Sequence, residues 1–131
     1  MSQKFVSTFK KFRTKTMFDA NEFRKALNIE LQGAIIKDTP VDTGALRGSW
    51  RTTTGEPSTD ESIRISESDA IAETRENQGE MNDTVYFINK MPYAMKIEFG
   101  GSPEKSPEGM VRKNLARAEG MAKAALRRWK G

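Results

Sequence analysis

The sequence predicts one α+β domain over residues 1–131, in which an N-terminal and a C-terminal helix flank a small, mostly antiparallel sheet. Two helices are predicted because apolar residues recur at spacings of three and four near both ends of the chain. The sheet is predicted because short β-prone runs lie between these stretches, separated by a long acidic loop at 56–83. With 36% hydrophobic residues, the chain can form one core.

The first helical signal is a basic segment at residues 1–16. Phe5, Phe9 and Phe12 recur there at spacings of four and three, between lysines and an arginine. This spacing predicts either a short amphipathic helix or an arm that orders only against a partner. Because so short a segment cannot bury three phenylalanines alone, they either pack back on the domain or anchor a neighbouring subunit.

A second helix is predicted to begin near Asp19, where Glu22 three positions later completes a capping box. The helix should end at Thr39, because the residue before Pro40 is disfavoured in the α region. The apolar face between these ends consists of Phe23, Leu27, Leu31, Ala34 and Ile35.

The middle of the chain is predicted to hold the strands. Residues 39–50 form a structured turn that leads into a strand at 49–54. Residues 62–66 alternate apolar and polar side chains, as a half-buried strand does, and 85–89 is the strongest strand candidate. Between these two strands, 67–83 is expected to be a long exposed loop with at most one helical turn.

The last third of the chain carries a short and a long helical pattern. Tyr93, Ala94 and Ile97 define a short helical face, and a loop rich in glycine and proline follows it. The long pattern is the clearest in the sequence, with arginines and lysines opposite its apolar stripe. That stripe consists of Val111, Leu115, Ala118, Ala122, Leu126 and Trp129.

The composition excludes several kinds of site. The chain has no cysteine and no histidine, so thiolate and imidazole metal sites, disulfides and the commonest catalytic bases are absent. It also lacks a glycine-rich phosphate loop and the acid spacing of a calcium loop. We therefore predict no catalytic residue, no cofactor and no metal. Glu98 is the one candidate for carboxylate chemistry, but a structural carboxylate that holds a backbone amide or an arginine is the commoner role.

No membrane span or export signal is predicted. The longest apolar runs are far shorter than the roughly 20 residues that a spanning helix needs, and the basic N-terminus lacks the apolar stretch of a secretory signal. These features predict a cytosolic soluble protein.

Charge is strongly segregated along the chain. The net charge of +4 combines +5 in residues 1–15, −7 in 56–83 and +6 in 110–131. Three interpretations fit this pattern: nucleic acid bound at the basic ends, head-to-tail self-association of acidic and basic surfaces, or merely solvated helix faces. The residues proposed for such interfaces are Phe5, Phe9, Phe12, Glu73, Glu76, Arg112, Arg117, Arg127 and Arg128.

Three stretches together resemble a known family. They are TPVDTGALRGSW at 39–50, NKMPYAMKIEFG at 89–100 and PEGMVR at 107–112. In this order they are similar to the tail-completion and tail-terminator proteins of long-tailed bacteriophages, the small head–tail joining proteins. The resemblance covers residues 20–128, while the basic N-terminal segment and the acidic insert depart from the family pattern.

The resemblance implies a structural virion protein without catalysis. Members of the family form rings, commonly hexameric, at the head-proximal end of the tail. The ring caps the tail tube, stops its growth and faces the neck. The implied partners are further copies of the chain, the tail tube protein and neck or connector proteins, with a contact to passing DNA and none to a membrane. The implied location is the virion, after assembly in the host cytoplasm.

The resemblance also implies structural roles for the motif residues. Thr43 and Gly44 would shape the turn into the strand, and Tyr93 and Ala94 would pack the short helix against the sheet. Glu98 and the glycine two positions later would fix the end of that helix, and the proline and glycine of the third motif would start the last helix. The full set is Thr43, Gly44, Leu46, Arg47, Pro92, Tyr93, Ala94, Glu98, Phe99, Gly100, Pro107 and Gly109.

Two other functions stay open at this point. One is a neck adaptor or stopper at the same junction, and the other is a small basic nucleic-acid-binding protein that uses residues 1–15 and 110–130. For a ring protein, the acidic loop at 56–83 is expected to face a neighbouring ring or the lumen, where it would repel DNA phosphates. Reversing the charge at Glu73 and Glu76 should then impair joining and leave the monomer folded.

Overall fold

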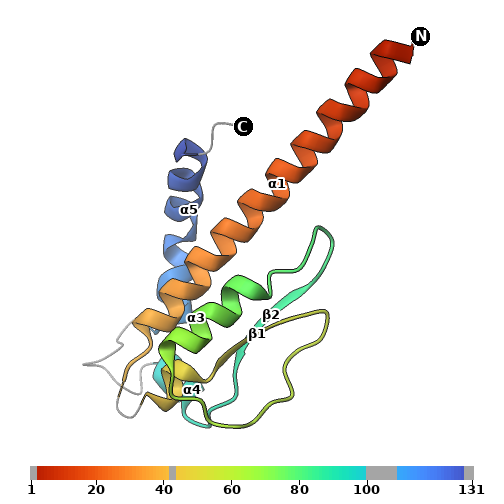
Figure 1. Cartoon of the computed structure of the whole chain (residues 1–131). Coiled ribbons are helices and arrows are strands. Elements are labelled where there is room, and N and C mark those ends of the chain that lie inside the picture. The colour runs from red at the N-terminus through yellow and green to blue at the C-terminus, as the bar shows by residue number, and fades with distance from the viewer. Residues whose placement is uncertain (1–2, 42–43, 100–108, 129–131) are drawn as a thin grey trace.

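The computed structural model describes residues 3–41, 44–99 and 109–128, and it confirms the α+β class. Helices flank a two-stranded antiparallel sheet (Figure 1). The elements in chain order are α1 (Gln3–Asp38), α2 (Ala45–Gly48), β1 (Trp50–Thr54), α3 (Glu67–Glu76), β2 (Val85–Asn89), α4 (Ala94–Glu98) and α5 (Val111–Arg128).

The basic N-terminal segment is the first half of α1, so the helix start predicted near Asp19 is wrong. The helix runs for 36 residues from Gln3 to Asp38. No glycine or proline interrupts its first half, and extending an existing helix needs no new nucleus, so the capping pattern lies inside the helix. The predicted end is confirmed, because α1 stops one residue before Thr39.

Only the C-terminal half of α1 lies in the body of the domain. This half packs against α3 and α5, and the N-terminal half extends beyond both helices (Figure 1). At 1.5 Å per residue, α1 is roughly 54 Å long and the 18 residues of α5 span roughly 27 Å. α5 is therefore too short to accompany α1 along its whole length.

The strands predicted at 49–54 and 85–89 are both confirmed. β1 and β2 pair antiparallel, with Trp50 opposite Asn89 and Thr54 opposite Val85. Trp50 stacks on the Phe87 ring, with 4.4 Å between the ring centroids and an interplanar angle of 4°. This pair places the aromatic face of the sheet on the core.

The strand predicted at 62–66 is wrong, because these residues belong to no strand or helix. The alternation is present but its burial is reversed: Ile63 and Ile65 are 64% and 65% exposed, whereas the side chain of Arg64 is largely buried. The guanidinium donates to Gly48 O (2.7 Å), Trp50 O (2.6 Å) and Glu73 Oε2 (2.9 Å). These bonds turn the segment with its arginine toward the domain.

The acidic loop predicted between the strands contains the ten-residue helix α3. The Ser66 side chain accepts a hydrogen bond from the backbone of Asp69 and caps the helix. Ala70 and Thr74 are buried, and Thr74 Oγ1 lies 2.8 Å from Thr52 Oγ1 of β1. Because α3 buries small residues, it has no stripe of large apolar side chains that the sequence could reveal.

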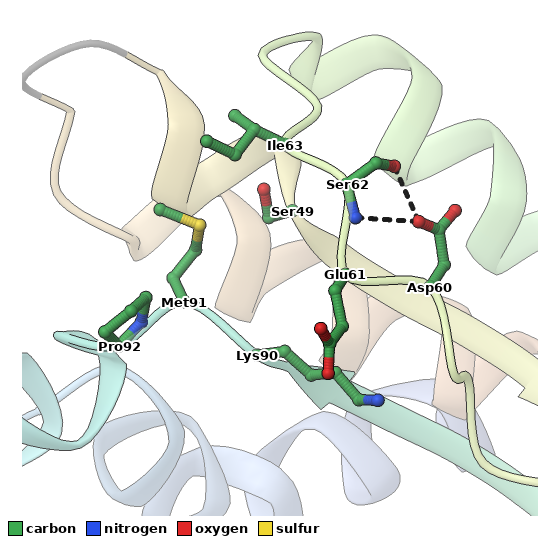
Figure 2. A pocket seen from close by; sticks show the side chains of 8 residues that line it. All are labelled: Ser49, Asp60, Glu61, Ser62, Ile63, Lys90, Met91 and Pro92. Carbon is green, nitrogen blue, oxygen red and sulfur yellow. Dashed lines mark hydrogen bonds between the residues drawn. The ribbon is translucent and has the colours of Figure 1, made fainter.

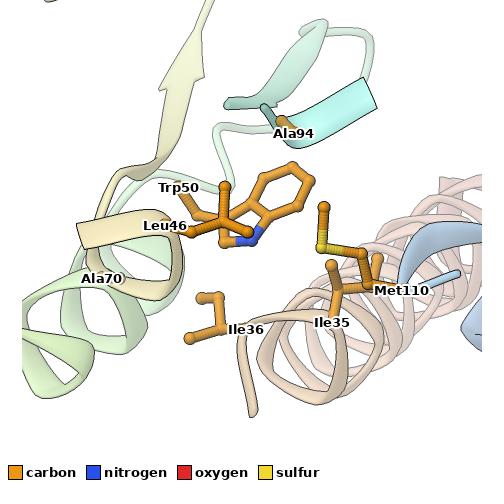
Figure 3. Close-up of a cluster of buried hydrophobic side chains, with 7 residues drawn as sticks. All are labelled: Ile35, Ile36, Leu46, Trp50, Ala70, Ala94 and Met110. Carbon is orange, nitrogen blue, oxygen red and sulfur yellow. The ribbon is translucent and has the colours of Figure 1, made fainter. Parts of the chain in front are cut away.

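One core joins the elements. Trp50 lies at its centre, with Leu46, Ala94 and Met110 around the indole (Figure 3). The buried cluster consists of Ile35, Ile36, Leu46, Trp50, Ala70, Ala94 and Met110. Each of the three sequence motifs thus supplies at least one core side chain.

Candidate functional site

The first motif closes the C-terminal end of α1. The last carbonyls of a helix have no partner within it, and Arg47 supplies one from the next helix. Its Nε donates to Thr39 O at 3.0 Å, and a terminal nitrogen donates to Lys37 O at 2.8 Å. The guanidinium also pairs with Glu67 of α3 at 3.4 Å. The motif arginine therefore joins α1 to α3.

The indole of Trp50 links the same helix end to the sheet. Trp50 Nε1 donates to Thr39 Oγ1 at 2.9 Å, and this hydroxyl donates to Ile35 O at 2.7 Å. The two motifs also bond directly, because Asn89 Nδ2 donates to Leu46 O at 2.7 Å. Buried polar groups of the two motifs thus satisfy one another.

Glu98 fastens the second motif to the third. Its carboxylate accepts hydrogen bonds from Met110 N (2.9 Å), Val111 N (2.7 Å), Arg112 N (3.1 Å) and Arg112 Nε (2.8 Å). The free N–H groups at the start of a helix attract an anion, so Glu98 acts as a remote cap of α5. These contacts match the expected structural role of a carboxylate that holds backbone amides and an arginine.

Gly109 makes room for this cap. Its φ is +78°, and a Cβ there would lie 2.5 Å from Glu98 Oε2 and 2.6 Å from Glu98 O. Both the backbone conformation and the close approach require glycine at this position.

The hydrogen bonds also set the charge state of Glu98. Burial by itself raises the pKa of this carboxyl. The bonds from Val111, Arg112 and Met110 outweigh burial and hold the pKa below its ordinary value. Glu98, 8% exposed, is therefore a buried carboxylate that stays ionised at neutral pH.

We expect this carboxylate to make stability depend on pH. A group whose pKa is lower in the folded chain adds stability above its unfolded pKa, and this stability is lost as pH falls through the folded value. The unfolding free energy should decrease between about pH 5 and about pH 3, and Glu98→Gln should flatten this slope. The pKa values of Asp60 and Glu80 are also lowered, by hydrogen bonds from Ser62 and Lys25 respectively, so only the difference between the two chains isolates Glu98. Urea unfolding across this range measures it, and parallel slopes would contradict the assignment.

The other residues of the first two motifs have different surroundings. Gly44 has a positive φ, +86°, and Leu46 and Ala94 are buried in the core. The packing role expected for Tyr93 is wrong: it stands at the N-terminal end of α4 with its side chain exposed, whereas Ala94 and Ile97 of this helix pack on the core. Pro92 is exposed as well.

The remaining motif residues lie at the edge of the site or outside the described residues. Phe99 is 62% exposed and lies under the Arg112 guanidinium, 4.8 Å from the ring centroid. This cation–π contact covers one face of the ring. Outside the described residues lie Thr43, Gly100 and Pro107.

Glu73, which was predicted on a partner surface, forms bonds within the chain. Glu73 Oε1 accepts from Thr52 N at 2.7 Å, and Oε2 accepts from Arg64 at 2.9 Å. This carboxylate ties α3 to β1 and to the segment before α3. Glu76, three positions later, is exposed, so only the second of the two predicted acids is available to a partner.

Charge reversal should therefore separate these two acids. Glu73→Lys is expected to lower the unfolding free energy by about 2–3 kcal/mol, because Thr52 N and Arg64 lose their acceptor and face a new cation. Glu76→Lys is the matched control and should change it by less than about 0.5 kcal/mol. Thermal unfolding of both variants measures the contrast, and equal midpoints would refute the role of Glu73.

Most of the basic residues of α5 are paired within the chain. Arg112 bonds to Glu98, and Lys113 and Arg117 lie 3.8 and 3.5 Å from Asp38 Oδ2. Asp38 also accepts a hydrogen bond from Asn114 at 3.0 Å, so this acid at the end of α1 binds three side chains from the first two turns of α5. Asp38 was not predicted from the sequence; an acid in the last turn of a helix, where the dipole disfavours it, is the signal that points to such a partner.

The side chains of the other predicted interface residues are described for Arg127 alone. Arg127 is exposed. The side chains of Phe5, Phe9, Phe12 and Arg128 lie outside the described residues, although their backbones belong to α1 and α5.

Within the described parts of the chain, no group of three or more carboxylates is placed to hold a metal ion. No helix there combines the length and apolarity that crossing a bilayer requires. The chain matches no protein family, no curated protein and no solved structure.

Proposed function

We propose that the chain is a ring-forming structural protein of a long-tailed bacteriophage that completes the tail and joins it to the head. The observation that carries the proposal is the convergence of the three motifs on one another. Arg47, Asn89 and Glu98 each bond to a different motif or helix end. The three segments that carry the family resemblance are thus joined by hydrogen bonds into one structural unit.

This arrangement supports an architectural rather than a catalytic role. Arg47, Asn89 and Glu98 are held by hydrogen bonds to backbone carbonyls and amides, whereas a side chain that reacts with a substrate has to be free to reach it. Glu98, the single acid considered for chemistry, has its oxygens occupied by four donors. We therefore propose that the motif residues hold the fold together and that the surfaces around them contact the partners.

The proposed partners are further copies of the chain, the tail tube protein and neck proteins. Segregated charge suits such contacts, because one patch then meets a different patch on the next copy and the rotation closes a ring. A neck adaptor or stopper would use the same surfaces at the same junction. The nucleic-acid alternative is less well supported, since Arg112, Lys113 and Arg117 already face carboxylates.

The test is a virus that lacks this chain. We expect lysates of the parent phage without it to contain DNA-filled heads and separate tails, with tails of irregular length. Electron microscopy counts joined particles, and the wild-type chain supplied from a plasmid should restore them. Joined, infectious particles in its absence would overturn the proposal.

A further inference from the structure

The first observation concerns the part of α1 that leaves the domain, residues 3–18, which we call the α1 arm. It carries five bases and no acid, and it extends beyond α3 and α5 (Figure 1). Positions 12 and 23 are about three helical turns apart, so positions 5, 9 and 12 continue the line of Phe23 and Leu27. Within the domain, Phe23 and Leu27 on this line are partly buried. In the α1 arm, the same line of positions extends beyond the last helix that packs on α1.

The second observation is an apolar surface that the fold leaves open. Because Arg64 is bonded inward, Ile63 and Ile65 face outward, each about two-thirds exposed. We call these two residues, with the neighbouring acids Asp60, Glu61 and Glu67, the isoleucine patch. Two large exposed side chains on one short segment are typical of a surface that a partner covers.

A pocket adjoins the patch. It has a volume of about 330 Å³ and lies between Ile63 on one side and Met91 with Pro92 on the other, and its charged lining residues are Asp60, Glu61 and Lys90 (Figure 2). Its apolar walls suit an aromatic side chain, and Asp60 and Glu61 outnumber the single cation, Lys90, among the residues that line it.

We propose that the α1 arm of one copy docks on the isoleucine patch of a second copy. The segments that carry the two surfaces have opposite charge: +5 on residues 1–15 against −7 on residues 56–83, a sum that includes Glu73 and Glu80, which are bonded within the domain. Asp60 and Glu67 are partly neutralised by Arg51 and Arg47. Glu61 pairs with no cation among the described residues, so it is the carboxylate most available to the arm.

The occupant is a second copy because the chain cannot fold its own arm back. α1 is one continuous helix, so the arm points away from the domain that carries the patch. Pairing of two arms is disfavoured because each carries five bases. The contact joins two different surfaces, so each copy offers an arm to one neighbour and a patch to the other, and repetition closes a ring or extends a chain.

The test uses full-length variants and light scattering behind size exclusion, at several concentrations and two salt levels. The patch variant is I63S/I65S and the arm variant is K10E/K11E. Matched controls are M95S, another strongly exposed apolar residue, and K123E/R127E, the same charge change on α5. Circular dichroism verifies that every variant is folded.

We expect the mass of the wild-type chain to rise above 14.7 kDa with concentration and to fall as salt rises. The patch and arm variants should each weaken self-association by at least about tenfold, and the controls by less than about twofold. A mixture of the two variants is the sharpest case. One supplies an intact arm and the other an intact patch, so the mixture should form dimers and nothing larger.

Three results would overturn the inference. They are a wild-type chain that stays monomeric at every concentration, an I63S/I65S variant that associates like the wild type, and a variant mixture without dimers. If K10E/K11E loses binding to duplex DNA and keeps self-association, the arm is a nucleic-acid contact and the inference also fails.

The inference rests on the proposed function only for closure of the contact into a ring. The two fail separately. A phage whose I63S/I65S chain still joins heads to tails would overturn the contact and leave the proposed function in place. A phage that needs no copy of the chain would overturn the proposed function, whatever the solution mass shows.

Discussion

Glu98→Ala should lower the unfolding free energy by about 3–4 kcal/mol at neutral pH. The substitution removes the acceptor of three backbone amides at the start of α5 and of Arg112 Nε, and leaves the guanidinium only its hydrogen bond to the backbone oxygen of residue 98. Three unsatisfied donors then remain at a helix end that is mostly buried, where water replaces the carboxylate poorly. Urea unfolding measures the loss, and amide hydrogen exchange should show the first turn of α5 opening first.

Glu119→Ala provides the matched control for this prediction. Glu119 lies on α5, is exposed and pairs only with Lys123, four positions later. Its removal should change the unfolding free energy by less than about 0.5 kcal/mol. If Glu98→Ala costs less than about 1 kcal/mol, the carboxylate does not hold α5 and the mechanical link between the motifs fails.

Gly48→Ala is the second large effect, with an expected loss of about 3 kcal/mol. A Cβ at Gly48 would overlap the carbonyl oxygen of Arg64 and lie 2.5 Å from the carbonyl carbon of Ile65. These atoms are backbone, held in place by the Arg64 bonds to Gly48 O and Trp50 O. The segment that carries the isoleucine patch would have to move, so both stability and self-association should suffer.

Gly33→Ala tests the same change where space is free. Gly33 lies inside α1, and nothing stands within 4 Å of the Cβ position. Alanine should therefore raise the unfolding free energy by about 0.5–1 kcal/mol, the ordinary gain over glycine in a helix. Thermal unfolding compares the two glycine variants, and a Gly48→Ala chain as stable as the wild type would contradict the close packing at this turn.

The elements that the sequence predicted correctly are those with large apolar or β-branched residues in regular order. β1, β2 and α5 carry such patterns, and each forms close to its predicted range. The end of α1 was predictable because Pro40 imposes a local steric rule. The start of α1 was not, because the Asp19–Glu22 pattern also fits within a continuing helix.

The two wrong predictions, a strand at 62–66 and a loop in place of α3, have a different physical cause. The alternation at 62–66 has period two, but three acceptors around Arg64 decide which face turns inward, and they come from elsewhere in the chain. α3 was missed because its fully buried residues are the small Ala70 and Thr74, and Ile71 is the one large apolar side chain that it packs against the core. Tertiary contacts determine both the orientation of residues 62–66 and the packing of α3, and the local pattern of apolar residues does not reveal these contacts.

The candidate site was predictable in part. The unusual position of Glu98, an acid on an apolar face, indicated a satisfied carboxylate, and its four donors are of the expected kind. Glu73 looked like one of many surface acids, because nothing local marks its bonds to Thr52 and Arg64. Acidic runs combine free and bonded carboxylates, and only the fold separates them.

The measurement that tests the proposed tail-completion role most directly is the number of copies of this chain in purified virions of the phage proposed to encode it. Quantitative mass spectrometry against the tail tube protein supplies it. A single closed ring predicts a fixed number of copies per virion, on the order of six, retained in isolated tails. Absence from purified virions, or a copy number that scales with tail length as the tube protein does, would contradict a ring at the head–tail junction.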